Sequence, residues 1–458
     1  MNTLSPLLTD LYQLTMAYGY WKSGKANQQA VFHLFFRKGP FGSGCAIAAG
    51  LQQVMQAITE FQFREEEIRY LKSLTSPNGK PLFEQAFLDY LMQLSFTGSL
   101  DAVPEGTVLF PQEPVLRIES SMIECQLLET MILNLMNFQT LIATKAARIC
   151  EAAAGDAVLE FGLRRAHGPN GGLLASRAAY IGGCLATSNV EAGKVWGIPV
   201  RGTHGHSWIM SFEKEEEAFR TYAISMPDPC ILLVDTYDTL EGIRRAITIG
   251  KELKGLGRTL AGIRLDSGDL VQLSIAARSL LDEAGFVNTK IVASNDLDEQ
   301  RISTLKQQGA RIDVWGVGTR LVTADQCPSL GGVYKLSLIQ DDQGDWMPRM
   351  KISSSPGKSS MPGKLQTMRV IQNKAWISDM IVHEHEESAQ PGMPLLQPMI
   401  RKGQVVASPV SIEEIKAHAA IQRVLFRKYL KGAQIHIPIS PSIRSLIDQL
   451  RNLVVKTD

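Results

Sequence analysis

The sequence of 458 residues lacks any apolar run long enough to cross a bilayer, and it has few cysteines. A membrane-spanning helix needs about 20 consecutive apolar residues, so we expect no transmembrane segment. The six cysteines are dispersed and form no Cys-x-x-Cys pair, which is typical of reduced thiols rather than of disulfides or a zinc site. The N-terminal residues also lack the basic start and apolar core of a signal peptide. We therefore expect a cytoplasmic protein.

The chain also lacks an excess of either charge. Lys and Arg total 47 and Asp and Glu total 46, which leaves a formal net charge of +1. Proteins that bind nucleic acid or an anionic membrane usually carry a clear basic excess on one face. We expect neither as a partner, whereas a small phosphorylated ligand needs only a few cations in a pocket.

Short apolar runs recur along the middle of the chain, and each is followed by a polar or Gly-rich cluster and then by a helical pattern. Runs that are apolar on both faces predict buried parallel strands joined by right-handed crossovers. Helices are expected at Thr239–Ile247 and Leu270–Ala284. The predicted strands are Ala157–Phe161, Ile198–Arg201, Ile231–Val234, Leu260–Ile263, Lys290–Ala293 and Ile312–Trp315.

The polar clusters at the ends of these runs distinguish between two α/β folds. A flat, doubly wound sheet binds its ligands at one switch point, whereas a barrel presents the carboxyl ends of all its strands to one site. Nearly every run here ends in reactive or Gly-rich residues. The pattern therefore favours an irregular or incomplete (β/α) barrel.

The flanking segments do not show the alternation of strands and helices. They contain short β-prone runs at Val31–Arg37, between residues 98 and 119, and after Gly331. We expect them to form a mostly β accessory domain. The expected division is an accessory part at residues 1–120, the catalytic barrel at 121–332, a return to the accessory domain at 333–410 and a helical segment at 411–458.

The run Arg201-Gly-Thr-His-Gly-His-Ser207 places two imidazoles and two hydroxyls directly after a predicted strand. Imidazole titrates near neutral pH, so either histidine can act as a nucleophile or proton carrier. A metal pair is a weaker interpretation because no third ligand lies nearby in the sequence. Taken alone, the run favours two ordinary loop histidines.

Basic and Gly-rich clusters suggest sites for phosphate. Arg164 and Arg165 follow a strand and precede a Gly-rich turn, and paired arginines hold phosphate oxygens well; we expect Arg165 to be the one that is only a surface charge. Gly316-Val-Gly-Thr319 lets backbone N–H groups approach a phosphate after a late barrel strand. The predicted phosphate contacts are therefore Arg164, Gly316, Gly318 and Thr319.

Acidic residues complete the candidate site. Arg264 and Asp266 offer a cation for an anionic ligand and a carboxylate for hydroxyl groups, although one of the residues 266–269 is expected to cap a helix. Asp235-Thr-Tyr-Asp238 is similar to the phosphoribosyl-diphosphate signature of Rossmann-like phosphoribosyltransferases, but it lacks the adjacent acids and the Thr-Gly-Gly-Thr loop. We reject that fold, and for Asp235 we leave open a diphosphate or magnesium contact or a cap.

Together these loops resemble the nicotinate phosphoribosyltransferase family of type II phosphoribosyltransferases. The similarity extends from Leu8-Thr-Asp-Leu-Tyr-Gln-Leu-Thr-Met16 to Leu330-Gly-Gly-Val-Tyr-Lys-Leu336. Its most specific part connects Glu160-Phe-Gly-Leu-Arg-Arg-Ala166 through Ala178-Ala-Tyr-Ile-Gly-Gly-Cys184 to Gly202-Thr-His-Gly-His-Ser-Trp208. The last hundred or so residues are less diagnostic.

The resemblance implies a reaction and a role for each residue. The family joins nicotinate to phosphoribosyl diphosphate, with ATP as co-substrate and Mg²⁺ carried on the substrate phosphates, so no protein metal site is expected. His206 would be the phosphohistidine and, with Arg264 and Asp266, catalytic. Nicotinate would contact Tyr12, Phe161, Thr203, Arg264 and Ser188, with Tyr12 supplied by the partner of a homodimer with shared active sites. Phosphoribosyl diphosphate would contact Arg164, Ser207, Asp266, Gly316, Gly318 and Thr319.

Three alternatives remain open at this point. A nicotinamide-using enzyme is opposed by Ser188, where amide-using relatives place an aspartate that accepts the amide N–H and repels a carboxylate. A quinolinate-using enzyme should have a shorter chain and a more basic pocket. A non-catalytic barrel that binds NAD metabolites predicts a broken histidine or phosphate loop, and both loops are intact.

Overall fold

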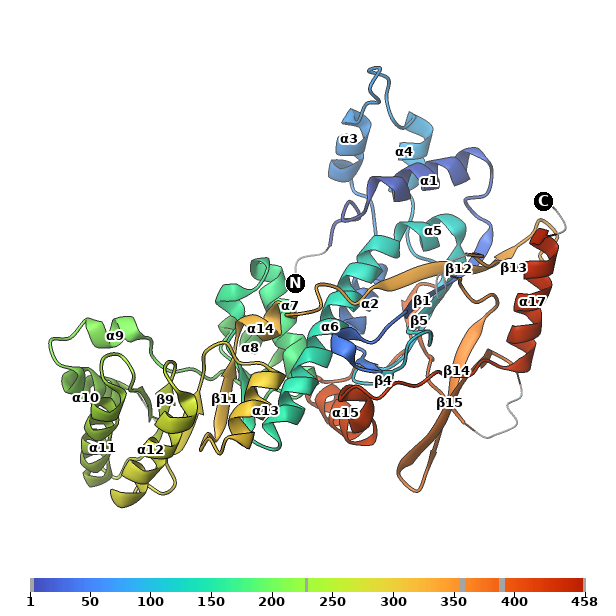
Figure 1. Cartoon of the computed structure of the whole chain (residues 1–458). Helices are drawn as coiled ribbons and strands as arrows, with labels where there is room; N and C mark the ends of the chain where they lie inside the picture. Colours follow the sequence, from blue (N-terminus) through green and yellow to red (C-terminus); the bar gives the residue numbers. More distant parts are fainter. Residues whose placement is uncertain (1–3, 227–229, 354–358, 387–391, 456–458) are drawn as a thin grey trace. The chain divides into compact units, whose positions relative to one another are not determined.

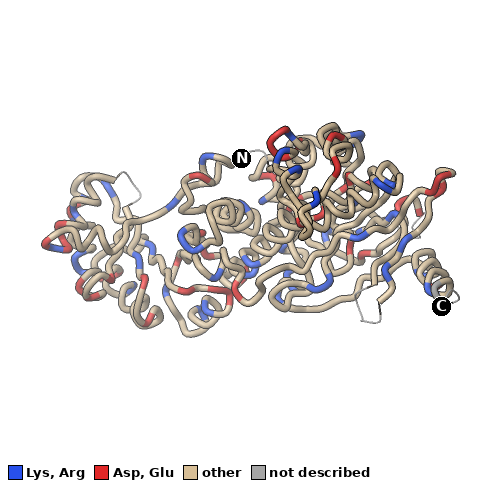
Figure 2. Tube along the Cα trace, turned by 90° about the horizontal axis from the view of Figure 1, so that it is seen from above, with Lys and Arg blue, Asp and Glu red and all other residues tan. Residues whose placement is uncertain are grey.

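The structure is a computed structural model that describes residues 4–226, 230–353, 359–386 and 392–455. The chain divides into two compact units (Figure 1). The barrel unit is Ile142–Pro328, and the accessory unit combines Met1–Leu141 with Ser329–Asp458. Basic and acidic residues are interspersed along the trace of each unit (Figure 2). No helix among the described residues is long and apolar enough to cross a membrane.

The barrel unit contains, within its described residues, a six-stranded parallel sheet in the order β7-β6-β11-β10-β9-β8. From β8 to β11 neighbouring strands follow the order of the chain, and β11 returns to pair with β6, whereas the described residues show no pairing of β7 with β8. The parallel sheet is curled into a half-barrel, which confirms the predicted incomplete barrel. The strands are β6 (Ala157–Glu160), β7 (Ala186–Thr187), β8 (Cys230–Leu233), β9 (Leu260–Leu265), β10 (Lys290–Ala293) and β11 (Val314–Val317).

Several predicted strands differ from the structure in extent: β11, for example, begins two residues later than predicted, and Ile198–Arg201 is not a regular strand. Of Ile198–Arg201, only Val200 forms a bridge, to Thr187 of β7. Pro199 has no N–H to donate, and the pairing consists of the Thr187 N–H to the Pro199 carbonyl and the Arg201 N–H to the Thr187 carbonyl. The segment therefore extends the sheet beyond β7 without becoming a regular strand.

Helices flank the strands of the barrel unit, as α12 and α13 do beside β9 and β11 in Figure 1. Three of the helices begin at aspartates whose carboxylates accept backbone N–H groups: Asp238 for α11, Asp269 for α12 and Asp298 for α13. Both predicted helices are confirmed. The helices are α7 (Gly168–Gly182), α8 (Val190–Trp196), α9 (His206–Met210), α10 (Glu215–Ser225), α11 (Thr239–Gly255), α12 (Leu270–Glu283), α13 (Glu299–Gln307) and α14 (Thr319–Val322).

The accessory unit is built on a sheet that has seven strands in the described part of the chain, in the order β13-β12-β1-β5-β3-β17-β18. All its pairings are antiparallel. Its strands are β1 (Gln29–Phe36), β3 (Ser99–Ala102), β5 (Leu116–Ser121), β12 (Gly332–Gln340), β13 (Trp346–Pro348), β17 (Gln397–Arg401) and β18 (Gln404–Val405). Two smaller sheets contain β2 (Ala46–Ile47), β4 (Val108–Leu109), β14 (Leu365–Gln372), β15 (Ala375–His383) and β16 (Met393–Pro394).

Helices complete the accessory unit. Residues 122–141, which we assigned to the barrel, belong to this unit because α5 (Met122–Leu127) packs on β1 and β5. The long helix α6 (Glu129–Ala153) begins here and crosses the boundary. The C-terminal segment is helical, with α15 (Ile412–Leu425), α16 (Arg427–Leu430) and α17 (Pro441–Val455). The remaining helices are α1 (Leu11–Lys22), α2 (Leu51–Thr59), α3 (Glu65–Ser73) and α4 (Gln85–Met92).

A buried ion pair with a neighbouring acid lies in the core of the accessory unit. Arg369 donates to Asp379 at 2.6 Å, and both side chains are at most 1% exposed. Glu113 accepts the Phe110 N–H at 2.7 Å and is fully buried beside Asp379. Burial and the negative charge of Asp379 raise the pKa of Glu113 well above its usual value. The folded protein therefore favours the neutral acid.

This acid makes a prediction about stability and pH. Because the pKa of Glu113 is raised in the folded state, its stabilising contribution is present below its unfolded pKa and is lost as the pH rises towards the folded one. Glutamine mimics the neutral acid, so Glu113→Gln should gain stability relative to the wild type as the pH rises from about 4.5 to 8. Chemical denaturation across this range measures the difference in the free energy of unfolding between the variant and the wild type. Glu66→Gln, at an exposed position in the same unit, is the control. A difference for Glu113→Gln that stays constant with pH would contradict the prediction.

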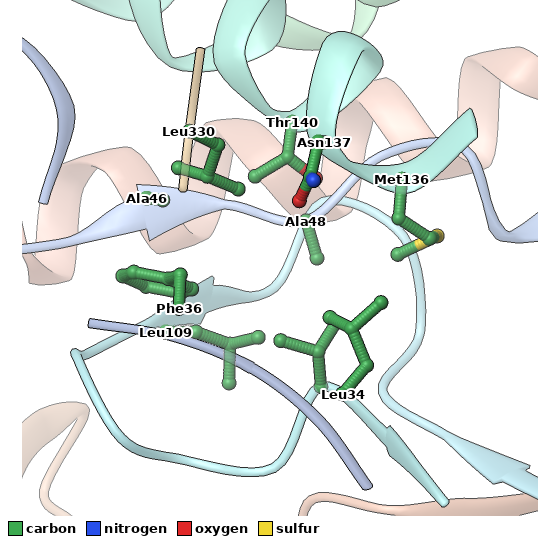
Figure 3. A pocket seen from close by; sticks show the side chains of 10 residues that line it. Leu34, Phe36, Ala46, Ala48, Leu109, Met136, Asn137, Thr140 and Leu330 are labelled. Carbon is green, nitrogen blue, oxygen red and sulfur yellow. The ribbon is translucent and has the colours of Figure 1, made fainter. Parts of the chain in front are cut away.

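A small cavity in the accessory unit is shown in Figure 3, where aliphatic side chains such as Leu34, Leu109 and Leu330 surround it. Only about 10 Å³ of it is open to the centre of a water molecule. That space holds about one water at most. The cavity is therefore a packing gap, and it is too small to bind a substrate.

Candidate functional site

Most of the predicted site residues line one open pocket of about 300 Å³ at the carboxyl ends of the barrel strands. Parallel strands end at the same edge, so the loops after β6, β7, β9, β10 and β11 all reach it. The pocket brings together the predicted residues Phe161, Arg164, Ser188, Thr203, Arg264, Asp266, Gly316, Gly318 and Thr319. It also contains Arg165, Gly202, Ser294, Asn295 and Asp296.

Arg264 is held by hydrogen bonds from all three of its guanidinium nitrogens. Nε donates to Ser294 Oγ, Nη1 to Thr203 Oγ1 and Nη2 to Asp266 Oδ1, each at 2.9 Å. Arg264 is the penultimate residue of β9, and Asp266 lies two positions further on the same face of the strand. The planar guanidinium is thus fixed in orientation at the pocket wall.

Asp266 is ionised in this environment. Burial raises the pKa of its carboxyl, but the hydrogen bond from Ser294 and the charge of Arg264 outweigh that effect, so that the pKa lies below its usual value. Its Oδ1 accepts from both Arg264 and Ser294. Among the described residues, Oδ2 has no donor, so it can accept a hydroxyl group from a ligand in the pocket.

Asp235 links the predicted histidine to the β9 loop. Its side chain is fully buried; Oδ2 accepts the Asp266 N–H and the Ser267 hydroxyl, each at 2.7 Å, and Oδ1 lies 3.3 Å from His206 Nε2. The sequence left open a metal contact or a helix cap for Asp235. The cap is wrong, since Asp238 caps the next helix, and the carboxylate of Asp235 faces the imidazole of His206. The contact of Asp235 with diphosphate or magnesium stays a prediction.

The two histidines of the Gly-Thr-His-Gly-His run have different environments. His204 is buried, and its Nε2 accepts the Leu233 N–H at 3.2 Å. Burial, together with the charges of Arg264 and His206, lowers the pKa of His204 to about 4. His204 is therefore a neutral structural residue, whereas the side chain of His206 is 40% exposed at the start of α9.

The β6 loop supplies the aromatic wall of the pocket. Phe161 follows β6 and lies against Gly316, where a Cβ atom would come within 2.7 Å of the Phe161 ring. Gly316 is thus required for packing against Phe161, and its contact with phosphate stays a prediction. Buried Glu160 anchors this end of the sheet, because it accepts hydrogen bonds from Ser176 at 2.8 Å and Thr187 at 2.5 Å. Sequence reasoning missed this role of Glu160.

Both arginines of the β6 loop are exposed and line the pocket. Arg165 is exposed, as expected of a surface charge, but it also lines the pocket. Beyond them, Asn295 and Asp296 have positive φ angles of 102° and 44°. Non-glycine residues rarely adopt this conformation, and such strain is often found at ligand sites. These two residues belong to the polar cluster that follows the run Lys290–Ala293, but the sequence predicts no individual role for either of them.

Three predicted residues do not line the pocket. His206 reaches it indirectly through Asp235, and Ser207 is exposed on α9. Tyr12 lies on α1 of the accessory unit, where it is 47% exposed. The proposed contact of Tyr12 with nicotinate stays a prediction.

Comparisons with known proteins match both units. Residues 7–137 match the model of the nicotinate phosphoribosyltransferase N-terminal domain, and residues 157–343 match that of the nicotinate phosphoribosyltransferase (NAPRTase) family. A nicotinate phosphoribosyltransferase from Bacillus subtilis is 46% identical over 366 residues, which cover 80% of this chain and 73% of that protein. One from Bos taurus is 33% identical over 97% of this chain and 96% of its own length.

A solved structure extends the similarity to the fold. The crystal structure of human nicotinic acid phosphoribosyltransferase superimposes with a TM-score of 0.84 and 30% identity, over 96% of this chain and 99% of that one. The matches to the two family models agree with the sequence identities and with the shared fold. The chain belongs to the nicotinate phosphoribosyltransferase family.

Proposed function

We propose that this protein transfers the phosphoribosyl group of phosphoribosyl diphosphate to nicotinate, giving nicotinate mononucleotide and diphosphate for the salvage of NAD. The convergence of Arg264, Asp266 and the Gly316 loop on one pocket supports this proposal most directly. The similar proteins from Bacillus subtilis and Bos taurus carry the name of this activity.

The pocket suits each part of the reaction. A free N–H of Arg264 and the Thr203 hydroxyl would bind the nicotinate carboxylate, while the Phe161 ring would stack on the pyridine. Asp266 Oδ2 would accept a ribose hydroxyl, and Arg164 with the Gly316–Thr319 loop would bind the 5′-phosphate. The pyridine nitrogen then attacks C1 of the ribose as the bond from C1 to the diphosphate oxygen breaks. The pocket would promote this reaction by positioning both substrates and by stabilising the negative charge of the leaving diphosphate.

Magnesium would be carried by the diphosphate. Among the described residues no group of three acidic, histidine or cysteine side chains could hold a metal ion. The carboxylates of Asp266 and Asp296 do line the pocket, which suits an ion that keeps most of its ligands from substrate and water. When bound, Mg²⁺ would neutralise the leaving diphosphate.

ATP would enter the reaction through His206. Because Asp235 Oδ1 faces Nε2 of His206, the hydrogen would reside on Nε2 and leave the Nδ1 lone pair free. Nδ1 would attack the γ-phosphorus of ATP, so that the N–P bond forms as the bond to the ADP oxygen breaks. Hydrolysis of the phosphohistidine would return the enzyme. The proposal also includes a homodimer, in which Tyr12 of one subunit completes the site of the other. It further includes a cytoplasmic location.

The proposed activity is tested by diphosphate release from phosphoribosyl diphosphate with nicotinate, nicotinamide or quinolinate, each with and without ATP. We expect release with nicotinate, increased by ATP, and little with the other two. Ser188→Asp should lower kcat/KM for nicotinate on the order of 10²-fold, because a second carboxylate at the pocket wall repels the substrate. Ser279→Asp, exposed on α12, is the control. Release with nicotinamide or quinolinate but not with nicotinate would refute the proposal, and release with none would favour a binding protein.

A further inference from the structure

Ser294 occupies a position set by the register of two parallel strands. Val292 and Ala293 of β10 pair with Arg264 and Leu265 of β9, and the Ser294 N–H continues the ladder to the Leu265 carbonyl at 3.0 Å. Ser294 therefore lies beside Asp266, and its side chain is on the same face as those of Arg264 and Asp266. It is 5% exposed, although it lines the pocket.

The direction of its hydrogen bonds is determined by chemistry. A guanidinium has donors only, so Ser294 Oγ must accept from Arg264 Nε. The single hydroxyl hydrogen is then free to be donated, and it points to Asp266 Oδ1. Ser294 thus connects Arg264 to Asp266 by two hydrogen bonds whose donors and acceptors cannot be exchanged.

We infer that Ser294 is a positioning residue that limits the ion pair of Arg264 and Asp266 to a single hydrogen bond. An arginine and a carboxylate that are this close tend to form two parallel hydrogen bonds, which would occupy both carboxylate oxygens. Ser294 takes the Nε–H and shares Oδ1 instead. One N–H of Arg264 and Oδ2 of Asp266 are thereby kept for ligands. The inference rests on the proposed function, in which these atoms bind nicotinate and ribose.

The bridge also keeps Asp266 ionised. Loss of the Ser294 hydroxyl would remove the hydrogen bond that most strongly opposes the effect of burial on the pKa of Asp266. The charged and titratable groups around this carboxyl are then Arg264 near the end of β9, His206 on α9, Asp235, which accepts the Asp266 N–H, and Asp296 at the pocket wall. The pKa of Asp266 would rise, and an ionised ribose contact would be lost at the acid end of the pH range.

Ser294→Ala tests the inference. We expect kcat/KM to fall about tenfold or more for both nicotinate and phosphoribosyl diphosphate, since a hydrogen bond between charged groups and a hydroxyl is lost at each residue. The acid limb of the profile of kcat/KM against pH should move to higher pH. Ser274→Ala is the matched control, because Ser274 is equally buried and hydrogen-bonded but lies on α12 away from the pocket. It should leave both KM values and the acid limb unchanged.

The outcomes separate the inference from the proposed function. A wild-type protein that forms no nicotinate mononucleotide would remove the proposed function. An active wild type whose Ser294→Ala variant keeps its KM values and its acid limb would overturn the inference. So would a Ser294→Ala variant that, like Ser274→Ala, changes only the midpoint of thermal unfolding.

Discussion

Replacement of His206 by alanine is expected to abolish the incorporation of acid-labile phosphate from γ-labelled ATP. His206 is the accessible histidine of the Gly-Thr-His-Gly-His run, and the carboxylate of Asp235 lies 3.3 Å from its Nε2. Without the imidazole, no nitrogen is positioned for attack on the γ-phosphorus. Formation of nicotinate mononucleotide should continue at a lower rate that no longer responds to ATP. Quantification of the labelled protein after a short exposure to ATP measures the effect.

Two further variants separate the nucleophile from its surroundings. Asp235→Asn should lower the rate of labelling about 10²-fold or more, because the amide oxygen can still accept the Asp266 N–H but the amide NH2 group would donate to His206 Nε2. The hydrogen of the imidazole would then move to Nδ1, and the lone pair that attacks the phosphorus would be lost. Loss of an orienting carboxylate lowers the rate by up to about 10⁴-fold in serine proteases. His204→Ala should retain labelling, since His204 already uses its Nε2 to accept from Leu233. Label that persists in His206→Ala would place the phosphorylated residue elsewhere.

Arg264→Met is expected to lower kcat/KM for nicotinate on the order of 10²- to 10³-fold. The substitution removes the cation for the carboxylate and leaves Asp266, Ser294 and Thr203 without their shared donor. Truncation of one member of a buried charge pair commonly costs about 2–5 kcal/mol. Steady-state kinetics with nicotinate as the varied substrate measures the loss.

Arg264→Lys shows whether charge or geometry matters more. Lysine keeps the positive charge but cannot make three hydrogen bonds in one plane, so we expect it to recover only a small part of the activity. Full activity in Arg264→Lys would mean that the planar network is not needed. Thermal unfolding of both variants shows whether the fold is retained.

The strands and the incomplete barrel could be predicted because buried parallel strands leave continuous apolar runs in the sequence. β7 could not, since Ala186–Thr187 is too short to have a periodicity. Residues 122–141 were assigned to the wrong unit because an apolar helix looks the same whichever core it joins. The apolar run at Ile198–Arg201 was real, but Pro199 limits its pairing.

The pocket residues were predicted to the extent that they lie in short, recognisable runs. Asp235 and Ser294 were not assigned their roles, because each acts on a residue about 30 positions away in the sequence. Ser294 reaches Asp266 through the register of β9 and β10, and Asp235 reaches His206 at the start of α9. A register between strands is a three-dimensional relation that no local motif expresses. The roles of Glu160 and the strained Asn295–Asp296 pair were missed for the same reason.

The return of β11 to β6 has a consequence for how the chain folds. These strands are neighbours in the sheet, yet nearly all of the barrel unit lies between them in the sequence. During synthesis, β6 can pair with β7 early, but its other edge must wait until β11 has left the ribosome. Contacts of such long sequence separation slow folding, and an unpaired apolar edge promotes aggregation. Assembly of the pocket is thus a late event, since Phe161 and Gly316 belong to these two strands and their loops.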